Sequence, residues 1–111
     1  KKWGAELKGK HGYSNLGAVV GATYPSELKN LREILPNTYF LIPGFGAQGG
    51  GVEDIIEGFN QDNLGEIVNS SRGIIFAYKN LKNYTEKEFA EAARKNSIIM
   101  KETINQGLNN R

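Results

Sequence analysis

Two kinds of apolar pattern alternate along this chain. Unbroken apolar runs occur at residues 16–22 and 39–42, and a weaker one occurs at 65–69. Runs of this kind are typical of strands that are buried on both faces, as in parallel sheets. Between and after these runs, apolar residues recur at the spacing of a helix face. The pattern therefore predicts strands that alternate with helices.

The first helix is expected after Pro25, a residue that suits the first helical turn. Apolar residues between Leu28 and Leu35 fall on one face of it, and Pro36 is expected to end it. A second, short helix is expected at 52–58, because valine, isoleucine and phenylalanine follow there at helical spacing.

The last helix is expected to begin near Thr85, since Thr85 and Glu88 have the spacing of a capping box. The helical pattern continues to Gln106, and Gly107 is predicted to stop it. The stretch 74–77 is expected to be a short apolar turn between the last strand and this helix.

This order of elements predicts an α/β fold with a parallel sheet and right-handed crossovers. The crossovers are short, which suits the βα units of a (β/α)₈ barrel or a compact doubly wound sheet. Residues 1–15 precede the pattern and are expected to form the end of a helix and then a loop.

Composition narrows the class of protein. The chain has 111 residues, and its 39% hydrophobic content is enough for one small globular domain. No apolar run approaches ~18 residues and the start does not resemble a signal peptide, so no membrane partner is expected. The absence of cysteine excludes disulfides and thiolate chemistry and fits a cytoplasmic protein. A net charge of +2 with mixed signs does not favour nucleic acid as a partner.

A glycine-rich loop at 43–51 is the first candidate site. Pro43 ends an apolar strand, six of the next eight residues are glycine or alanine, and a helix is expected afterwards. Glycine lets the backbone approach a ligand closely and leaves N–H groups that point at it, so this arrangement predicts an anion site. Gln48 is the polar side chain within the loop, and its amide suits a phosphate oxygen. An exposed loop glutamine without a ligand is the alternative.

A second candidate site follows the next strand, in the segment Ser70-Ser71-Arg72-Gly73. The planar fork of Arg72 can grip a phosphate, and the N–H groups of Arg72 and Gly73 would add to the same site. In (β/α)₈ barrels a phosphate commonly binds between the loops after strands 7 and 8. The alternative is a surface arginine at a helix start, a poor position for a cation unless an anion is present.

Other interpretations of these residues remain open. The string Gly44-x-Gly46-x-x-Gly49 matches a dinucleotide fingerprint, and Arg72 would then bind a 2′-phosphate in an NADP-dependent oxidoreductase. Pro43, the additional glycines and the short following helix argue against this interpretation. A glycine turn without any ligand is a further alternative.

The chain shows no convincing acid–base or nucleophile–base pair. His11 lies in a polar loop and is expected at the surface, and Glu66 is expected to be solvated. The segment therefore has the features of a binding region without a reaction centre.

Taken together, three motifs resemble orotidine 5′-phosphate decarboxylase of the bacterial branch. They are Gly17-Ala18-Val19-Val20-Gly21-Ala22-Thr23, Leu41-Ile42-Pro43-Gly44-Phe45-Gly46-Ala47-Gln48-Gly49-Gly50 and Val68-Asn69-Ser70-Ser71-Arg72-Gly73-Ile74. The resemblance implies a TIM barrel, a homodimer, and decarboxylation of orotidine 5′-monophosphate to uridine 5′-monophosphate (UMP) without a cofactor. Residues 1–111 would be the C-terminal segment of that single domain, with strands 6–8 present and strands 1–5 absent.

The resemblance also implies roles for individual residues. Gln48 would bond to the 5′-phosphate when the glycine loop, including Gly46, closes over it. Arg72 would bind the same phosphate, and backbone N–H groups from Ser71 to Gly73 would complete the site. Pro43 would border the pyrimidine.

One departure from the family is large. Its chemistry resides in an Asp-x-Lys-x-x-Asp array, whereas the aspartates here are Asp54 and Asp62, and neither begins such an array. No catalytic residue and no metal ligand is therefore expected in this segment, which alone is expected to be inactive. Its expected partners are the substrate, the N-terminal part of the same enzyme and a second copy. A non-catalytic half-barrel that binds a phosphate or nucleotide is the alternative.

Overall fold

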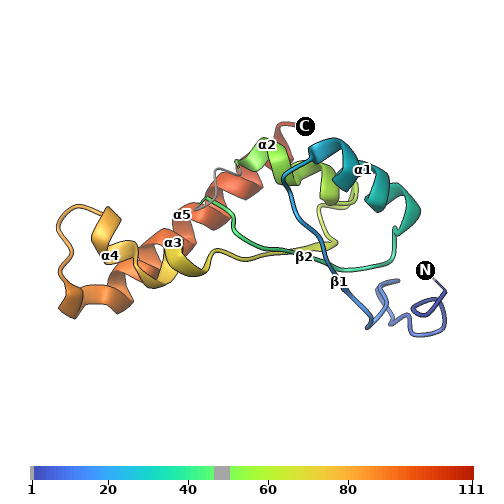
Figure 1. The fold of residues 1–111 in the computed structure, drawn as a ribbon, viewed down its shortest axis with the longest axis horizontal. Helices are drawn as coiled ribbons and strands as arrows, with labels where there is room; N and C mark the ends of the chain where they lie inside the picture. The colour runs from blue at the N-terminus through green and yellow to red at the C-terminus, as the bar shows by residue number, and fades with distance from the viewer. Residues whose placement is uncertain (1, 47–50) are drawn as a thin grey trace.

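The computed structural model describes residues 2–46 and 51–111, and its core is a parallel sheet (Figure 1). The strands are β1 (Ala18–Val19), β2 (Phe40–Ile42) and β3 (Glu66–Val68), in the order β1-β2-β3. Both pairings are parallel. The predicted parallel βα order is confirmed, and the first strand is shorter than the apolar run 16–22 that predicted it.

Helices follow each strand. They are α1 (Pro25–Ile34), α2 (Val52–Ile55), which continues as the 3₁₀ turn η1 (Ile56–Gly58), α3 (Ser71–Ile75), α4 (Ala77–Asn80), the 3₁₀ turn η2 (Glu86–Glu88) and α5 (Phe89–Asn109). The stretch predicted as an apolar turn at 74–77 contains instead the end of α3 and the start of α4, with Phe76 as a turn residue between them. The helix end predicted before the first strand is also wrong, because residues 2–6 form turns and Lys8 makes an antiparallel bridge to Ser14. None of the helices in the described ranges is long and apolar enough to cross a membrane.

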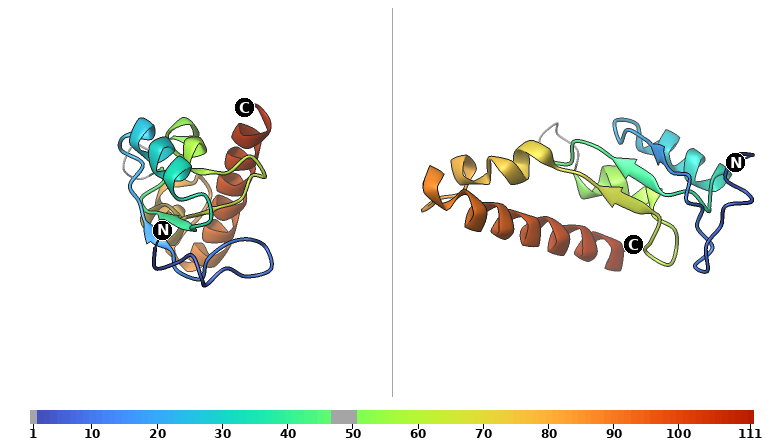
Figure 2. Two further views of the ribbon diagram at one scale, coloured as in Figure 1. Left: turned by 90° about the vertical axis from the view of Figure 1, so that its right-hand side faces the viewer. Right: turned by 90° about the horizontal axis from the view of Figure 1, so that it is seen from below.

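The hydrophobic core lies between the sheet and α1, α2 and α5. Figures 1 and 2 show these helices beside the strands. Phe40 and Ile42 of β2 are fully buried and point into this layer. The helices contribute Leu28, Ile55, Ile104 and Leu108. Burying side chains of this size stabilises the fold by about 1.5–3 kcal/mol each.

The opposite face of the sheet is not covered by residues 2–46 or 51–111. Val19, Leu41 and Ile67 are 71%, 39% and 59% exposed. Val19 is the register partner of Leu41, and Leu41 is that of Ile67, so the three form one apolar row across the sheet. Since side chains alternate along a strand, this row and the buried Phe40 and Ile42 lie on opposite faces.

The last helix begins as predicted and ends differently. Glu88 Oε1 accepts a hydrogen bond from the backbone N of Thr85, as a capping box requires, and a second one from Thr85 Oγ1. Gly107 does not stop the helix, which continues to Asn109. A Cβ on Gly107 would lie 2.1 Å from Val52 Cγ1. Glycine is therefore needed inside α5 because α2 packs directly against it.

Arg32 joins four segments at the end of the sheet where β2 and β3 begin. Its guanidinium donates to the carbonyl oxygens of Leu35, Thr38, Gly58 and Gly65 at 2.6–2.8 Å. It also lies 3.8 Å from the ring centroid of Phe40, which is a cation–π contact. Hydrogen bonds to neutral carbonyls compensate only in part for burial, and burial lowers the pKa of Arg32.

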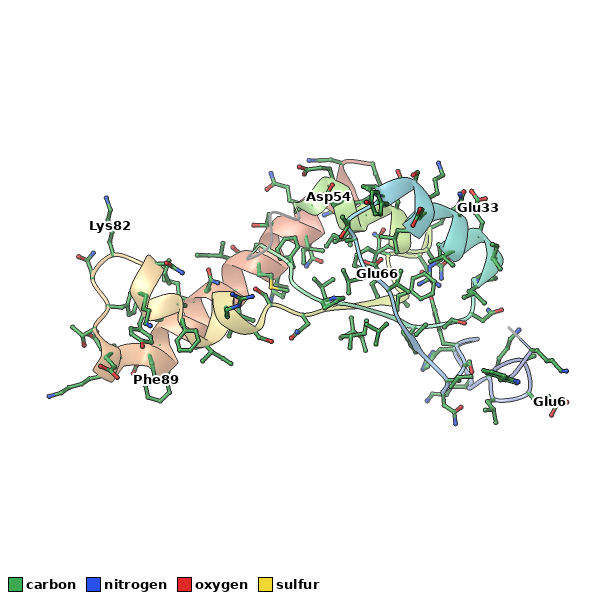
Figure 3. All side chains as sticks on the ribbon, viewed as in Figure 1. Glu6, Glu33, Asp54, Glu66, Lys82 and Phe89 are labelled. Carbon is green, nitrogen blue, oxygen red and sulfur yellow. The ribbon has the colours of Figure 1, made fainter. Side chains whose placement is uncertain are left out.

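Glu66 is not solvated, contrary to the prediction. It shares a face of the sheet with Val68, and Figure 3 shows it between the strands and the helices. Both carboxyl oxygens are buried without a hydrogen-bond partner in the described residues. Burial raises the pKa of Glu66 to about 8, although Arg32 and Arg111 oppose the change.

Candidate anion-binding site

The carboxyl ends of β2 and β3 lie side by side, and backbone bonds hold the two following loops together. Asn69 N donates to Ile42 O at 2.8 Å, and Phe45 N donates to Asn69 O at 3.1 Å. The pairing thus extends beyond the strands. As a result, the start of the glycine loop lies beside the segment that opens α3.

Two glycines turn the chain at the end of β2. Gly44 and Gly46 have φ angles of +81° and +78°, in the left-handed region that other residues rarely adopt. They flank Phe45, whose N–H and C=O both bond to the loop after β3. The glycines predicted to open this loop are thus required by its backbone conformation.

Ser70 forms a direct side-chain link between the two loops. Its Oγ donates to Phe45 O at 2.8 Å, and the residue is 5% exposed. Ser70 occupies the N-cap position of α3, where a serine usually accepts a bond from the backbone of the first turn. It makes no such cap in the described structure. The hydroxyl connects the loops instead.

Asn96 of α5 forms a hydrogen bond with the first turn of α3. Its Nδ2 donates to Gly73 O at 2.6 Å. A Cβ on Gly73 would lie 2.6 Å from Ser70 Oγ and 3.8 Å from Asn96 Nδ2. Gly73 is therefore glycine because the Ser70 hydroxyl occupies the space of a side chain.

A cavity of about 560 Å³ lies next to these contacts, and residues of the two loops, α3, α4 and α5 line it. Its lining consists of Phe45, Gly46, Ser70, Arg72, Gly73, Phe76, Ala77, Lys79, Asn80, Leu81, Asn96, Ile99, Met100 and Thr103. Within the described residues, this lining holds two cationic side chains and no acidic one. Lys79 Nζ lies 4.8 Å from the ring centroid of Phe76. A cavity with positive charge alone favours an anionic ligand.

The structure brings together part of the predicted site. Gly46, Arg72 and Gly73 line the cavity. Ser71 is exposed, its Oγ accepts a bond from Asn69 Nδ2 at 3.2 Å, and it is not part of the lining. Pro43 is exposed at the end of β2, also outside the lining. Gln48 lies outside the described residues.

Sequence reasoning assigned no role to Ser70, Lys79 or Asn96, which are among the lining residues, although Ser70 lies in the segment predicted as the second candidate site. Asn96 carried a usable signal, because a polar side chain on the inner face of a helix needs a hydrogen-bond partner. Ser70 carried none, since its partner is a backbone carbonyl 25 residues away. His11 is exposed, as predicted. In residues 2–46 and 51–111, no group of three or more His, Cys, Asp or Glu side chains is placed to hold a metal ion.

These features define a class of protein. A parallel sheet built from βα units, with a candidate anion site beyond the carboxyl ends of its strands, is the arrangement of (β/α)₈ barrels and of doubly wound α/β proteins.

Comparison with known proteins makes the class specific, although no family model matches the chain. It is 50% identical over 107 residues to orotidine 5′-phosphate decarboxylase of Caldicellulosiruptor bescii, covering 96% of this chain and 34% of that protein. It is 47% identical over 105 residues to the enzyme of that name from Clostridium perfringens, covering 95% of this chain and 36% of the relative.

Solved structures agree with the curated relatives. A Toxoplasma gondii protein assigned as an orotidine-monophosphate-decarboxylase matches with a TM-score of 0.61 and 31% identity, over 85% of this chain and 28% of that one. UMP synthase from Leishmania donovani matches with a TM-score of 0.52 and 34% identity, over 77% of this chain and 18% of that one.

Over nearly its whole length, the chain is thus similar to a part of orotidine 5′-phosphate decarboxylase. It spans about a third of the length of the curated relatives it matches. The resemblance seen in the sequence and the predicted fold class are confirmed.

Proposed function

We propose that this chain is the C-terminal segment of an orotidine 5′-phosphate decarboxylase and supplies strands 6–8 of its barrel. The complete enzyme would convert orotidine 5′-monophosphate to UMP in the cytoplasm, as a step of pyrimidine biosynthesis. The observation that carries this proposal is an identity near one half, over almost the entire chain, to proteins of that name. The positively charged cavity at the strand ends supports it independently.

In this proposal the segment binds the phosphate of the substrate. Arg72 supplies a charge-assisted hydrogen bond, and backbone N–H groups of the glycine loop and of residues 71–73 add to it. Gln48 and Pro43 keep, as predictions, the phosphate and pyrimidine contacts that the resemblance assigns. The phosphate is remote from the bond that breaks, yet its binding energy can be used to position the substrate for decarboxylation.

The uncovered sheet face supports assembly with the rest of a barrel. A row of exposed apolar side chains, Val19, Leu41 and Ile67, would become the interior of a closed barrel, and the open edges of β1 and β3 would pair with further strands. We propose that the N-terminal part of the enzyme supplies these strands and the reaction centre. The complete enzyme is proposed to act as a homodimer, on the resemblance alone.

Substitution of Arg72 tests the assignment. In the full-length decarboxylase, Arg72→Ala is expected to lower kcat/KM roughly 10- to 200-fold, mainly through KM, if the charged bond contributes about 1.5–3 kcal/mol. Arg94→Ala is the matched control, because Arg94 is exposed on α5 and is not in the lining of the cavity. An Arg72→Ala enzyme with the kcat/KM of wild type would refute the phosphate role.

A non-catalytic phosphate-binding half-barrel is the second candidate. The observation in its favour is a cavity with two cations and, in the described residues, no acidic side chain to act as an acid or base. Decarboxylation by the natural gene product would exclude it. Titration with UMP beside NADP would exclude the oxidoreductase interpretation, which the short α2 after the glycine loop already disfavours.

A further inference from the structure

Two hydrogen bonds next to the cavity hold in place the two segments that a bound phosphate would contact, namely the start of the glycine loop and the start of α3. We propose that Ser70 and Asn96 are positioning residues that set the spacing between Gly46, at the start of the glycine loop, and Arg72. This inference rests on the proposed function, because it concerns how the same site is held in its binding geometry.

Ser70 completes a two-point attachment of the glycine loop. The N–H of Phe45 donates to Asn69 O at 3.1 Å, and the carbonyl of Phe45 accepts from Ser70 Oγ at 2.8 Å. Both polar backbone groups of Phe45 are thus bound to the loop after β3. Without the Ser70 hydroxyl, one attachment would remain and the Phe45 carbonyl would lose its partner.

The attachment matters because of the residues around it. Gly44 and Gly46 flank Phe45 on either side, and glycine is the residue that restricts the backbone least. Gly46 lines the cavity, so its position depends on the orientation of the Phe45 carbonyl next to it. A bond that fixes this carbonyl therefore fixes the first lining residue of the glycine loop.

Asn96 fixes the other side of the site. Its Nδ2 donates to Gly73 O at 2.6 Å, and Gly73 follows Arg72 directly in α3. Asn96 lies within the 21-residue helix α5, whereas α3 has five residues. The short helix that carries Arg72 is therefore attached to the long one by this bond.

The two bonds meet at Gly73. A Cβ there would lie 2.6 Å from Ser70 Oγ, so Ser70 packs closely against the peptide that Asn96 holds. The single hydroxyl proton of Ser70 is used by Phe45 O, and the hydroxyl therefore positions the loop rather than donating to a ligand. The two residues together fix Gly46 and Arg72 relative to each other.

Kinetics on two substrates tests the inference in the full-length decarboxylase. Ser70→Ala and Asn96→Ala are compared with wild type on orotidine 5′-monophosphate and on orotidine, which is the same substrate without phosphate. For each variant kcat/KM on the phosphorylated substrate is expected to fall roughly 3- to 10-fold, mainly through KM, as for the loss of a hydrogen bond. On orotidine it is expected to change by less than about twofold, because the phosphate contacts are absent.

Matched variants separate positioning from general stability. Ser97→Ala is the control, because Ser97 Oγ donates to Ala93 O within α5. Loss of this bond is expected to leave kcat/KM unchanged on both substrates. Ser70→Thr retains a hydroxyl and is expected to restore much of the loss. If Ser70→Ala reduces the yield of folded enzyme, Asn96→Ala decides alone, since it leaves the Ser70–Phe45 bond in place.

The outcomes are distinct. Equal losses on both substrates, or wild-type kinetics in both variants, would overturn the inference while leaving the proposed function intact. A wild-type enzyme that does not decarboxylate orotidine 5′-monophosphate would refute the proposed function, and the inference with it.

Discussion

Neutralising Glu66 is expected to stabilise the folded protein near pH 8 and to make its stability less dependent on pH. Both oxygens of this carboxyl are buried without a partner in the described structure, and burial raises its pKa to about 8 from an ordinary value of 4.5. Between these two pH values the folded state holds a proton that the unfolded chain releases. The free energy of unfolding therefore falls as pH rises through this range and levels off above pH 8.

The pKa difference sets the size of the effect. At about 1.4 kcal/mol per pH unit, the interval from 4.5 to about 8 gives an upper limit of about 5 kcal/mol. Solvent screening reduces this figure, so we expect Glu66 to destabilise the fold by about 2 kcal/mol at pH 8 relative to pH 5. Glu66→Gln has the shape of the protonated acid, and it should recover most of that amount at pH 8 and little at pH 5.

Urea unfolding of the full-length protein at pH 5 and pH 8 measures this difference directly. Glu57→Gln is the control, because Glu57 lies on η1 in an exposed ion pair with Lys29 at 3.8 Å, and such pairs contribute about 0–1 kcal/mol. The reasoning would be refuted if Glu66→Gln were destabilising by more than about 1 kcal/mol at pH 8. That result would mean that Glu66 is ionised in the folded state and stabilised by Arg32 or Arg111.

Two further predictions concern packing and catalysis. Gly107→Ala is expected to destabilise the protein by about 1–2 kcal/mol in urea unfolding, because the new Cβ would overlap Val52. This loss is expected although alanine ordinarily favours a helix over glycine by about 1 kcal/mol. Adding Val52→Ala to this variant should restore most of the loss, and a Gly107→Ala protein more stable than wild type would contradict the close packing of α5 on α2. The isolated 111-residue chain is expected to show no decarboxylation of orotidine 5′-monophosphate, and measured turnover would place the reaction centre within these residues.

The local pattern predicted the fold better than it predicted individual environments. Unbroken apolar runs and helical spacing located the strands and helices, because both patterns can be recognised from residues that are close in the sequence. The expected burial of the strands on both faces is not seen in the described structure, where Val19, Leu41 and Ile67 are exposed on one face. Gly107 was misinterpreted because its role comes from α2, which packs against it through Val52, a residue 55 positions earlier in the chain. Glu66 could have been placed correctly, since it shares a strand face with Val68.

The candidate site also combines residues that belong to local motifs with residues whose partners are distant in the sequence. Gly46, Arg72 and Gly73, which line the cavity, could be predicted as candidates because glycine loops and arginines at strand ends form local motifs. The bonds from Ser70 and Asn96 join side chains to backbone carbonyls that lie 25 and 23 residues away. No local pattern encodes such pairs, because the acceptor is a group that every residue possesses.

The alternation of buried and uncovered positions along β2 has a consequence for tolerance to substitution. Phe40 and Ile42 are enclosed by helices of this chain, whereas Leu41 between them is 39% exposed. Polar replacement of Phe40 or Ile42 should disrupt the segment on its own. Polar replacement of Leu41 should leave the segment intact and harm only a closed barrel. In a mutational scan of the segment alone, polar substitutions at Phe40 and Ile42 would therefore be destabilising while those at Leu41 would be tolerated. In a scan of the complete enzyme, polar substitutions at all three positions would be destabilising.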